Sequence, residues 1–163
     1  MKRIILFVFV CCVVSCSKDV EIKNSYVYNI NDVNVTQQGS NKDVPKTTTE
    51  FISIAYTDLF NTVISNTKLV EISTAYASFG DKKLIEDRII RQFLADTNVV
   101  IPAASTMRND IALFITQSYG RFFNRSPSDF EKNYLKNVIQ NDTAITPAML
   151  YYSFMTSNEY RYY

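Results

Sequence analysis

Apolar side chains recur every three or four residues from Thr47 to the end of the sequence, the spacing that places them on one face of a helix. Residues typical of helix starts precede these runs. Thr47 stands three residues before Glu50, as in a capping box, and Pro147 follows Thr146. The pattern predicts an all-α domain over 48–163.

We expect six helices, with a connector over 98–105. Ser126 is expected to cap the fifth helix, with Pro127 in its first turn, and Gly80 to end the second. The approximate ranges are 48–62, 67–79, 81–96, 105–123, 127–141 and a last helix from Pro147 onward. The expected apolar face of the fifth helix consists of Phe130, Tyr134, Val138 and Ile139.

Part of this sequence is repeated. Residues 51–61 (FISIAYTDLFN) align with 114–124 (FITQSYGRFFN) at an offset of 63, and residues 91–96 align with 152–157 at an offset of 61. The repeat predicts two three-helix units, over 48–97 and 110–160, with chance similarity between amphipathic helices as the alternative. One such unit buries too little apolar area alone, so we expect the two to share a core.

The sequence begins with two basic residues after Met1, Lys2 and Arg3. The apolar run Ile4–Val14 follows them and is too short to span a bilayer as a helix. The run ends in Val13-Val14-Ser15-Cys16, which resembles the lipobox of bacterial lipoprotein precursors at all four positions. The resemblance implies a signal peptide over 1–15, cleavage before Cys16, and fatty acid such as palmitate attached there. It implies an outer-membrane location, facing either the periplasm or the cell surface.

A mature chain that starts at Cys16 has nearly balanced charge and no second cysteine. Cys11 and Cys12 leave with the signal peptide, so no disulfide can form within the chain. Loss of Lys2 and Arg3 leaves fifteen basic against sixteen acidic residues. This balance argues against nucleic-acid binding and against electrostatic adhesion to an anionic membrane. The membrane is therefore expected to be reached through the lipid alone.

Residues 16–47 are rich in Asn, Asp, Ser, Lys and Gln, which predicts a flexible tether between the lipid and the domain. Within this segment, residues 26–30 (YVYNI) with Val33 and Val35 favour a strand that could pair with a partner or dock on the domain. The charged run Lys18–Glu21 resembles the export signal of surface lipoproteins in Bacteroidota, and this resemblance favours the cell surface.

The second unit contains an apolar pair, a tyrosine, a turn sequence and a closing motif, which are Phe114-Ile115, Tyr119, Phe122–Asp129 (FFNRSPSD) and Ser157–Tyr160 (SNEY). This pattern resembles a small helical domain of bacterial extracellular proteins that is similar to the phycobilisome-linker domain. The resemblance implies a role in assembly and scaffolding, and it brings no catalytic residues. Its motif residues here are Tyr119, Arg125, Pro127 and Glu159.

The amino-acid composition excludes most kinds of catalytic site. The sequence has no histidine, and no free cysteine remains once Cys16 is lipidated, which excludes Ser-His and Cys-His nucleophiles and thiolate zinc sites. Its three glycines cannot build a phosphate-binding loop. Glu86 and Asp87 are adjacent, point about 100° apart on a helix, and are expected to pair with nearby basic residues. We expect no enzyme, no cofactor and no metal site.

Two residues near the turn of the second unit carry specific expectations. Arg125 is expected to bond open carbonyls of the preceding helix end, or Glu159, with an anion or partner contact as the alternative. Gly120 lies inside a helix, where glycine costs about 1 kcal/mol relative to alanine, so we expect a close helix crossing there.

The tyrosines near the C-terminus are more than one helix face can bury. An exposed patch that docks a partner or stacks on sugar is therefore expected, with burial of some of them as the alternative. The residues are Tyr151, Tyr152, Tyr160, Tyr162 and Tyr163.

The sequence as a whole predicts a non-catalytic envelope lipoprotein whose helical domain is an interaction or assembly module, accessory to an envelope complex with a protein partner. The alternative is a surface lipoprotein that binds a glycan or peptide through the tyrosine patch. A hydrolase is the least favoured class, because it would need two carboxylates that converge in a pocket.

Overall fold

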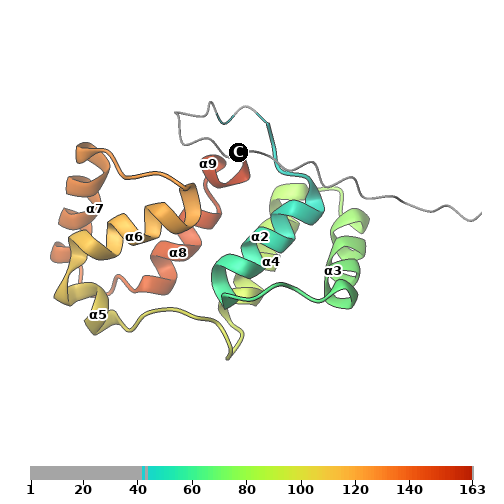
Figure 1. The fold of residues 1–163 in the computed structure, drawn as a ribbon, viewed down its shortest axis with the longest axis horizontal. Coiled ribbons are helices and arrows are strands. Elements are labelled where there is room, and N and C mark those ends of the chain that lie inside the picture. The colour runs from blue at the N-terminus through green and yellow to red at the C-terminus, as the bar shows by residue number, and fades with distance from the viewer. Residues whose placement is uncertain (1–41, 43, 163) are drawn as a thin grey trace, which may run out of the picture. The chain divides into compact units, whose positions relative to one another are not determined.

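Eight helices form the part of the chain that the structure, a computed structural model, describes, which is Lys42 and residues 44–162 (Figure 1). No strand occurs among these residues, so the all-α prediction is confirmed for them. The helices are α2 (Thr48–Phe60), α3 (Asn66–Ser78), α4 (Lys82–Leu94), α5 (Ala104–Asn109), α6 (Ile111–Phe123), α7 (Asp129–Asn141), α8 (Pro147–Met155) and α9 (Asn158–Arg161). The expected signal peptide, Cys16, the strand over 26–30 and most of the tether lie outside the described residues.

Two helices more than expected are present. The predicted helix over 105–123 is divided at Asp110, whose extended backbone (φ −144°, ψ 85°) ends α5. The Asp110 side chain then caps α6 by accepting the Leu113 N–H (2.9 Å). The last expected helix is also divided, because Ser157 caps a separate short α9.

The start of α7 differs from the prediction by two residues. Ser128 rather than Ser126 is its N-cap, and Glu131 completes the capping box by accepting the Ser128 N–H (2.8 Å). Pro127 consequently precedes the helix and does not occupy its first turn.

The helices pack as two groups of three around one apolar core. In the first group α2 contacts α3 and α4, in the second α6 contacts α7 and α8, and α4 contacts α8. Buried residues of both groups belong to a single cluster, which includes Phe51 and Phe93 from the first group and Phe114 and Phe154 from the second. The prediction of two three-helix units with a shared core is confirmed.

The sequence repeat is also a structural repeat. Helices α2 and α6 each have 13 residues and end at an asparagine with positive φ, Asn61 (52°) and Asn124 (51°). Four residues later, Ser65 and Ser128 cap α3 and α7. Each unit also closes a cluster of three aromatic rings at equivalent positions, which are Tyr56, Phe60 and Phe93 in the first unit and Tyr119, Phe123 and Phe154 in the second.

Replacement of the two left-handed asparagines provides a test of this repeated turn. Asn61→Ala or Asn124→Ala should each cost about 1–2 kcal/mol, because a Cβ-bearing residue without a short polar side chain is strained at positive φ. Asn124→Gly should be neutral or slightly stabilising, since glycine adopts this conformation freely, whereas Asn61→Gly also loses the hydrogen bond that Arg121 donates to the Asn61 side chain. Urea denaturation of the four variants measures the difference. A similar loss for Asn124→Ala and Asn124→Gly would contradict the conformational explanation.

Gly120 does not mark a close helix crossing, so that expectation is wrong. The residue is exposed, and a Cβ built on it would meet no atom within 4 Å outside its own helix backbone and chain neighbours. Gly120→Ala should therefore stabilise the protein by about 0.5–1 kcal/mol, the ordinary helix preference of alanine. A rise in the thermal midpoint measures this gain, and a lower midpoint would contradict it.

Candidate functional site

The described C-terminal tyrosines do not form an exposed patch. Tyr151 and Tyr160 are buried, with exposed fractions of 4% and 0%. Tyr151 packs against Phe114 and Phe122 of the second unit, whereas Tyr160 packs between the two units. Tyr152 is half-buried, and only Tyr162 is exposed. Tyr163 lies outside the described residues. The glycan-binding alternative rested on a patch that these tyrosines do not form.

Tyr160 joins the two units at the core. Its ring packs edge-on against Phe51 of α2 and Phe122 of α6, with centroids 6.1 Å from each. Its hydroxyl donates to Asp58 of α2 (2.7 Å), which satisfies a polar group inside the apolar contact. Burial raises the pKa of Tyr160 well above its usual value, and burial also raises the pKa of Asp58. Tyr160 is therefore a core residue and not a binding residue.

Tyr152, Glu86 and Asp87 make a second set of contacts between the units. The Tyr152 hydroxyl donates to Asp87, which also forms an ion pair with Arg91 (2.8 Å). Glu86 instead pairs with Arg161 of α9 (3.0 Å). Asp87 thus binds a nearby basic residue as expected, whereas Glu86 binds one that is distant in sequence. Among the described residues, no three His, Cys, Asp or Glu side chains group in a way that could hold a metal ion.

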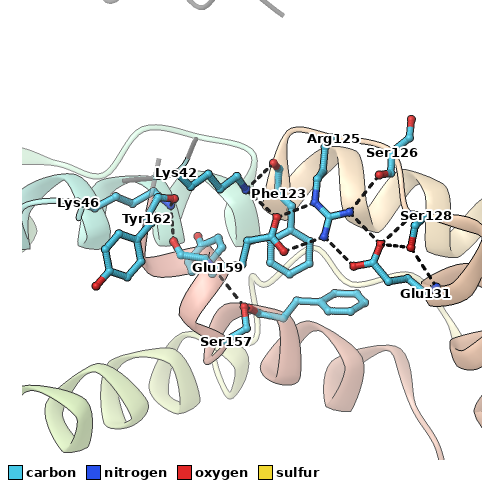
Figure 2. Close-up of polar contacts among 12 residues, drawn as sticks. Lys42, Lys46, Phe123, Arg125, Ser126, Ser128, Glu131, Ser157, Glu159 and Tyr162 are labelled. Carbon is cyan, nitrogen blue, oxygen red and sulfur yellow. Dashed lines mark hydrogen bonds and ion pairs between the residues drawn. The ribbon is translucent and has the colours of Figure 1, made fainter. Parts of the chain in front are cut away.

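Arg125 is the centre of an ion-pair network in the second unit (Figure 2). Its guanidinium donates two bonds to Glu159 of α9 (2.6 and 2.8 Å) and two to Glu131 of α7 (2.9 and 2.7 Å). The same group lies over the Tyr119 ring, 5.0 Å from its centroid. The contact expected between Arg125 and Glu159 is present. The network ties the turn after α6 to both neighbouring helices.

The network determines the charge states of its members. Hydrogen bonds from Arg125 lower the pKa of Glu131 to about 2 and also lower the pKa of Glu159. Burial, together with the Glu131 charge, raises the pKa of Tyr119 to about 12. Both carboxylates are accordingly ionised near neutral pH and engaged by one arginine. Three of the four motif residues meet here, while Pro127 lies beside the network, in the turn before α7.

The end of the expected tether belongs to the folded domain. Lys42 donates to the Phe123 carbonyl (2.8 Å) and to Glu159 (3.0 Å). Lys46 is buried, its backbone N–H donates to the Arg161 carbonyl (3.0 Å), and its ammonium donates to the Tyr160 carbonyl. Burial lowers the pKa of Lys46 to about 8. The boundary expected at residue 47 is therefore too late, because Pro45 pairs with Tyr162, the residue after α9, in an isolated bridge and Lys46 bonds to Arg161.

The surface of α7 carries an exposed aromatic pair that the sequence pattern had placed in the core. Phe130 is 78% exposed and Tyr134 is 60% exposed, and their rings stack with centroids 6.3 Å apart. The face of α7 toward the core presents Ile139, which was expected there and is the only buried residue of this helix, and Leu135, which packs against the core. The repeat could have revealed this arrangement, since Ile139 corresponds to Tyr76, the only buried residue of α3.

Two clefts in the described part of the chain lie beside contacts between helices, and both are small. The first, of about 150 Å³, lies where α2 and α4 meet α8 and α9. The second, of about 90 Å³, lies between the segment 102–110 and helices α6 and α8. Both are smaller than the roughly 300 Å³ at which pockets for small-molecule ligands begin. Neither brings two free carboxylates together, because Glu86 and Asp87 in the first are both ion-paired.

No protein-family model matches this chain, and neither a curated protein nor a solved structure matches it. The resemblances to lipoprotein precursors and to the linker-like domain stay predictions. Among the residues that the structure describes, no helix is long and apolar enough to cross a bilayer.

Proposed function

We propose that this protein is a non-catalytic interaction module of the bacterial cell envelope, held at the outer membrane by lipid on Cys16. The lipobox match supports the anchor, and two or more acyl chains would hold the protein firmly without a membrane-spanning segment. The near-neutral charge of the mature chain supports a role for lipid, and not surface charge, in membrane attachment.

The observation that carries the proposal is the exposed Phe130–Tyr134 pair. At the equivalent positions of α3 the first unit has Thr67 and Glu71, which are also exposed. The fold therefore does not require aromatic side chains there. Burial of one such side chain in a partner is worth about 1.5–3 kcal/mol, and aromatic residues are enriched at protein interfaces. Packing among the described residues does not explain why these two exposed positions of α7 are aromatic.

The chemistry around the pair favours a protein partner over the bilayer. Helices that lie in a membrane interface have a broad apolar face and a polar face rich in lysine and arginine. On α7 the exposed residues nearest the aromatic face by helical spacing are Asn133, Asn137 and Asn141. Two aromatic anchors with surrounding amides suit a pocket on a protein, where the amides can form hydrogen bonds at the rim.

Site-specific photo-crosslinking in cells tests the proposal. With p-benzoylphenylalanine at position 130 or 134, we expect a discrete adduct with one envelope protein. The same probe at Thr67 or Glu71, the matched positions on α3, should give no such adduct. Phe130→Ala combined with Tyr134→Ala should weaken capture of that protein about tenfold or more, as expected when interface anchors are removed.

The anchor is checked in the same cells. A clickable palmitate analogue should label the protein, and Cys16→Ser should abolish the labelling. Equal crosslinking from α3 and α7, or adducts with lipid alone, would contradict a docking role for α7. Absence of labelling would contradict the lipid anchor on Cys16. It would not change what the crosslinking shows about docking through α7.

A further inference from the structure

The second cleft shares two repeat-equivalent positions with the first cleft, and an arginine lines the first cleft. Phe114 and Tyr151 line the second cleft. Their repeat equivalents, Phe51 and Ile90, line the first cleft, together with Arg161 from α9. The guanidinium of Arg161 lies over the Phe51 ring, 5.0 Å from its centroid, and forms an ion pair with Glu86. In the first unit, this groove therefore holds an arginine against an aromatic ring and a carboxylate.

The second cleft offers two of these three kinds of group, the aromatic ring and the carboxylate. Phe114 and Tyr151 stack nearly parallel, with an interplanar angle of 7° and centroids 6.0 Å apart. Asp110 contributes a carboxylate that caps α6 but makes no ion pair with any described residue. Arg121 touches Tyr151 from outside the cleft, and its guanidinium already donates to Asn61 and to the Tyr151 hydroxyl.

Ser118 supplies an independent sign that a polar ligand belongs in this cleft. Its side chain is only 2% exposed, lines the cleft, and has a hydroxyl with no hydrogen-bond partner among the described residues. An unsatisfied buried hydroxyl costs about 1–3 kcal/mol. The equivalent residue of the first unit is Ala55, which is fully buried and apolar. The fold therefore accepts alanine at this position, and the serine is unexplained by packing.

The geometry points to the second cleft as a binding site for the arginine side chain of a partner polypeptide. The guanidinium would stack against Phe114 and donate to Asp110, as Arg161 stacks on Phe51 and donates to Glu86, and the Ser118 hydroxyl would bond another polar group of the same polypeptide. A volume of about 90 Å³ suits the end of one side chain and not a whole metabolite. This site goes beyond the proposed docking of α7 and does not depend on it.

NMR titration of the mature chain, kept unlipidated by Cys16→Ser, tests the site. The probe is the tripeptide acetyl-Gly-Arg-Gly-amide, and the comparison peptide has norleucine in place of arginine. We expect saturable shifts at millimolar concentration in the amides of Thr106, Leu113, Gln117 and Ser118 with the arginine peptide only. Free guanidinium chloride should shift the same amides more weakly, because it lacks the peptide and the aliphatic stem.

Two substitutions make the assignment specific. Asp110→Asn keeps a good N-cap for α6 but removes the charge, and it should weaken binding about threefold. Ser118→Ala should also weaken binding while leaving the fold intact, as Ala55 indicates. Asp129→Asn removes the same charge from the first turn of α7 and should have no effect. The proposal is overturned if the norleucine peptide binds equally well, if no shift saturates, or if Asp110→Asn binds the arginine peptide as the unchanged chain does.

Discussion

Replacement of Tyr160 by alanine is expected to destabilise the domain by about 3–5 kcal/mol, the usual cost of removing a large aromatic side chain from a core. The ring is fully buried between Phe51 and Phe122, so its loss leaves a cavity where the two units meet. The loss should also leave the half-buried Asp58 carboxylate without the hydrogen bond that Tyr160 donates. Urea denaturation followed by circular dichroism measures the change in the free energy of unfolding.

Two further variants separate the ring from the hydroxyl. Tyr160→Phe removes only the bond to Asp58 and should cost about 1–3 kcal/mol, the penalty for an unsatisfied buried group. Tyr162→Ala, two residues along the chain, alters an exposed side chain and should change stability by less than about 0.5 kcal/mol. If Tyr160→Ala unfolds at the same urea concentration as the unchanged protein, the ring does not join the two units.

Replacement of Arg125 by alanine is expected to lower the free energy of unfolding by about 2 kcal/mol at neutral pH. The stability of the variant should also change less as the pH is lowered. Arg125 donates charge-assisted hydrogen bonds to two carboxylates, which are stronger than bonds between neutral groups. The expected loss is moderate because about a third of each side chain remains exposed to solvent, which screens these ion pairs. Arg88→Ala, which removes an exposed arginine on α4, is the matched control.

The sign of the acid effect follows from the lowered pKa values. The pKa of Glu131 is about 2 in the folded protein and that of Glu159 is also lowered, whereas an unfolded glutamate has a pKa of about 4.3. The stabilisation from these groups is thus complete above the unfolded pKa and is lost as pH falls from about 5 toward 2. The free energy of unfolding, measured between pH 7 and pH 3, should fall less steeply for Arg125→Ala. An equally steep fall in both proteins would contradict the assignment.

Periodicity, caps and the repeat were enough to predict the fold because each depends on neighbours in sequence. The capping box at Thr47 and Glu50 is present as expected, and both asparagines at the repeated turn adopt the same conformation. The division at Asp110 and the separate α9 were missed, since apolar spacing continues across them. Apolar spacing indicates which face of a helix is buried, but it does not show where a single non-helical residue interrupts that helix.

The candidate site was harder to predict because exposure depends on contacts between distant segments. Along α7, Phe130 and Tyr134 form one apolar stripe, and Leu135 and Ile139 form another on a different side. Spacing alone cannot decide which stripe meets α6. Tyr160 was expected to be exposed and is buried. Nothing near it in sequence shows that it packs against Phe51 and bonds to Asp58. Arg125 was easier, because its expected partner, Glu159, belonged to the same motif.

The pairing of Pro45 and Lys46 with Tyr162 and Arg161 determines where mechanical tension would act on an anchored domain. A pull on the chain from its N-terminal side would act on Lys42, which is bonded to Glu159 of α9, and on Lys46, whose N–H is bonded to the Arg161 carbonyl. The strained element would be the four-residue α9, and its displacement would withdraw Tyr160 from between the two units. A strongly pulled domain would therefore begin to open at its C-terminal helix, and the junction between its halves would fail before either bundle does.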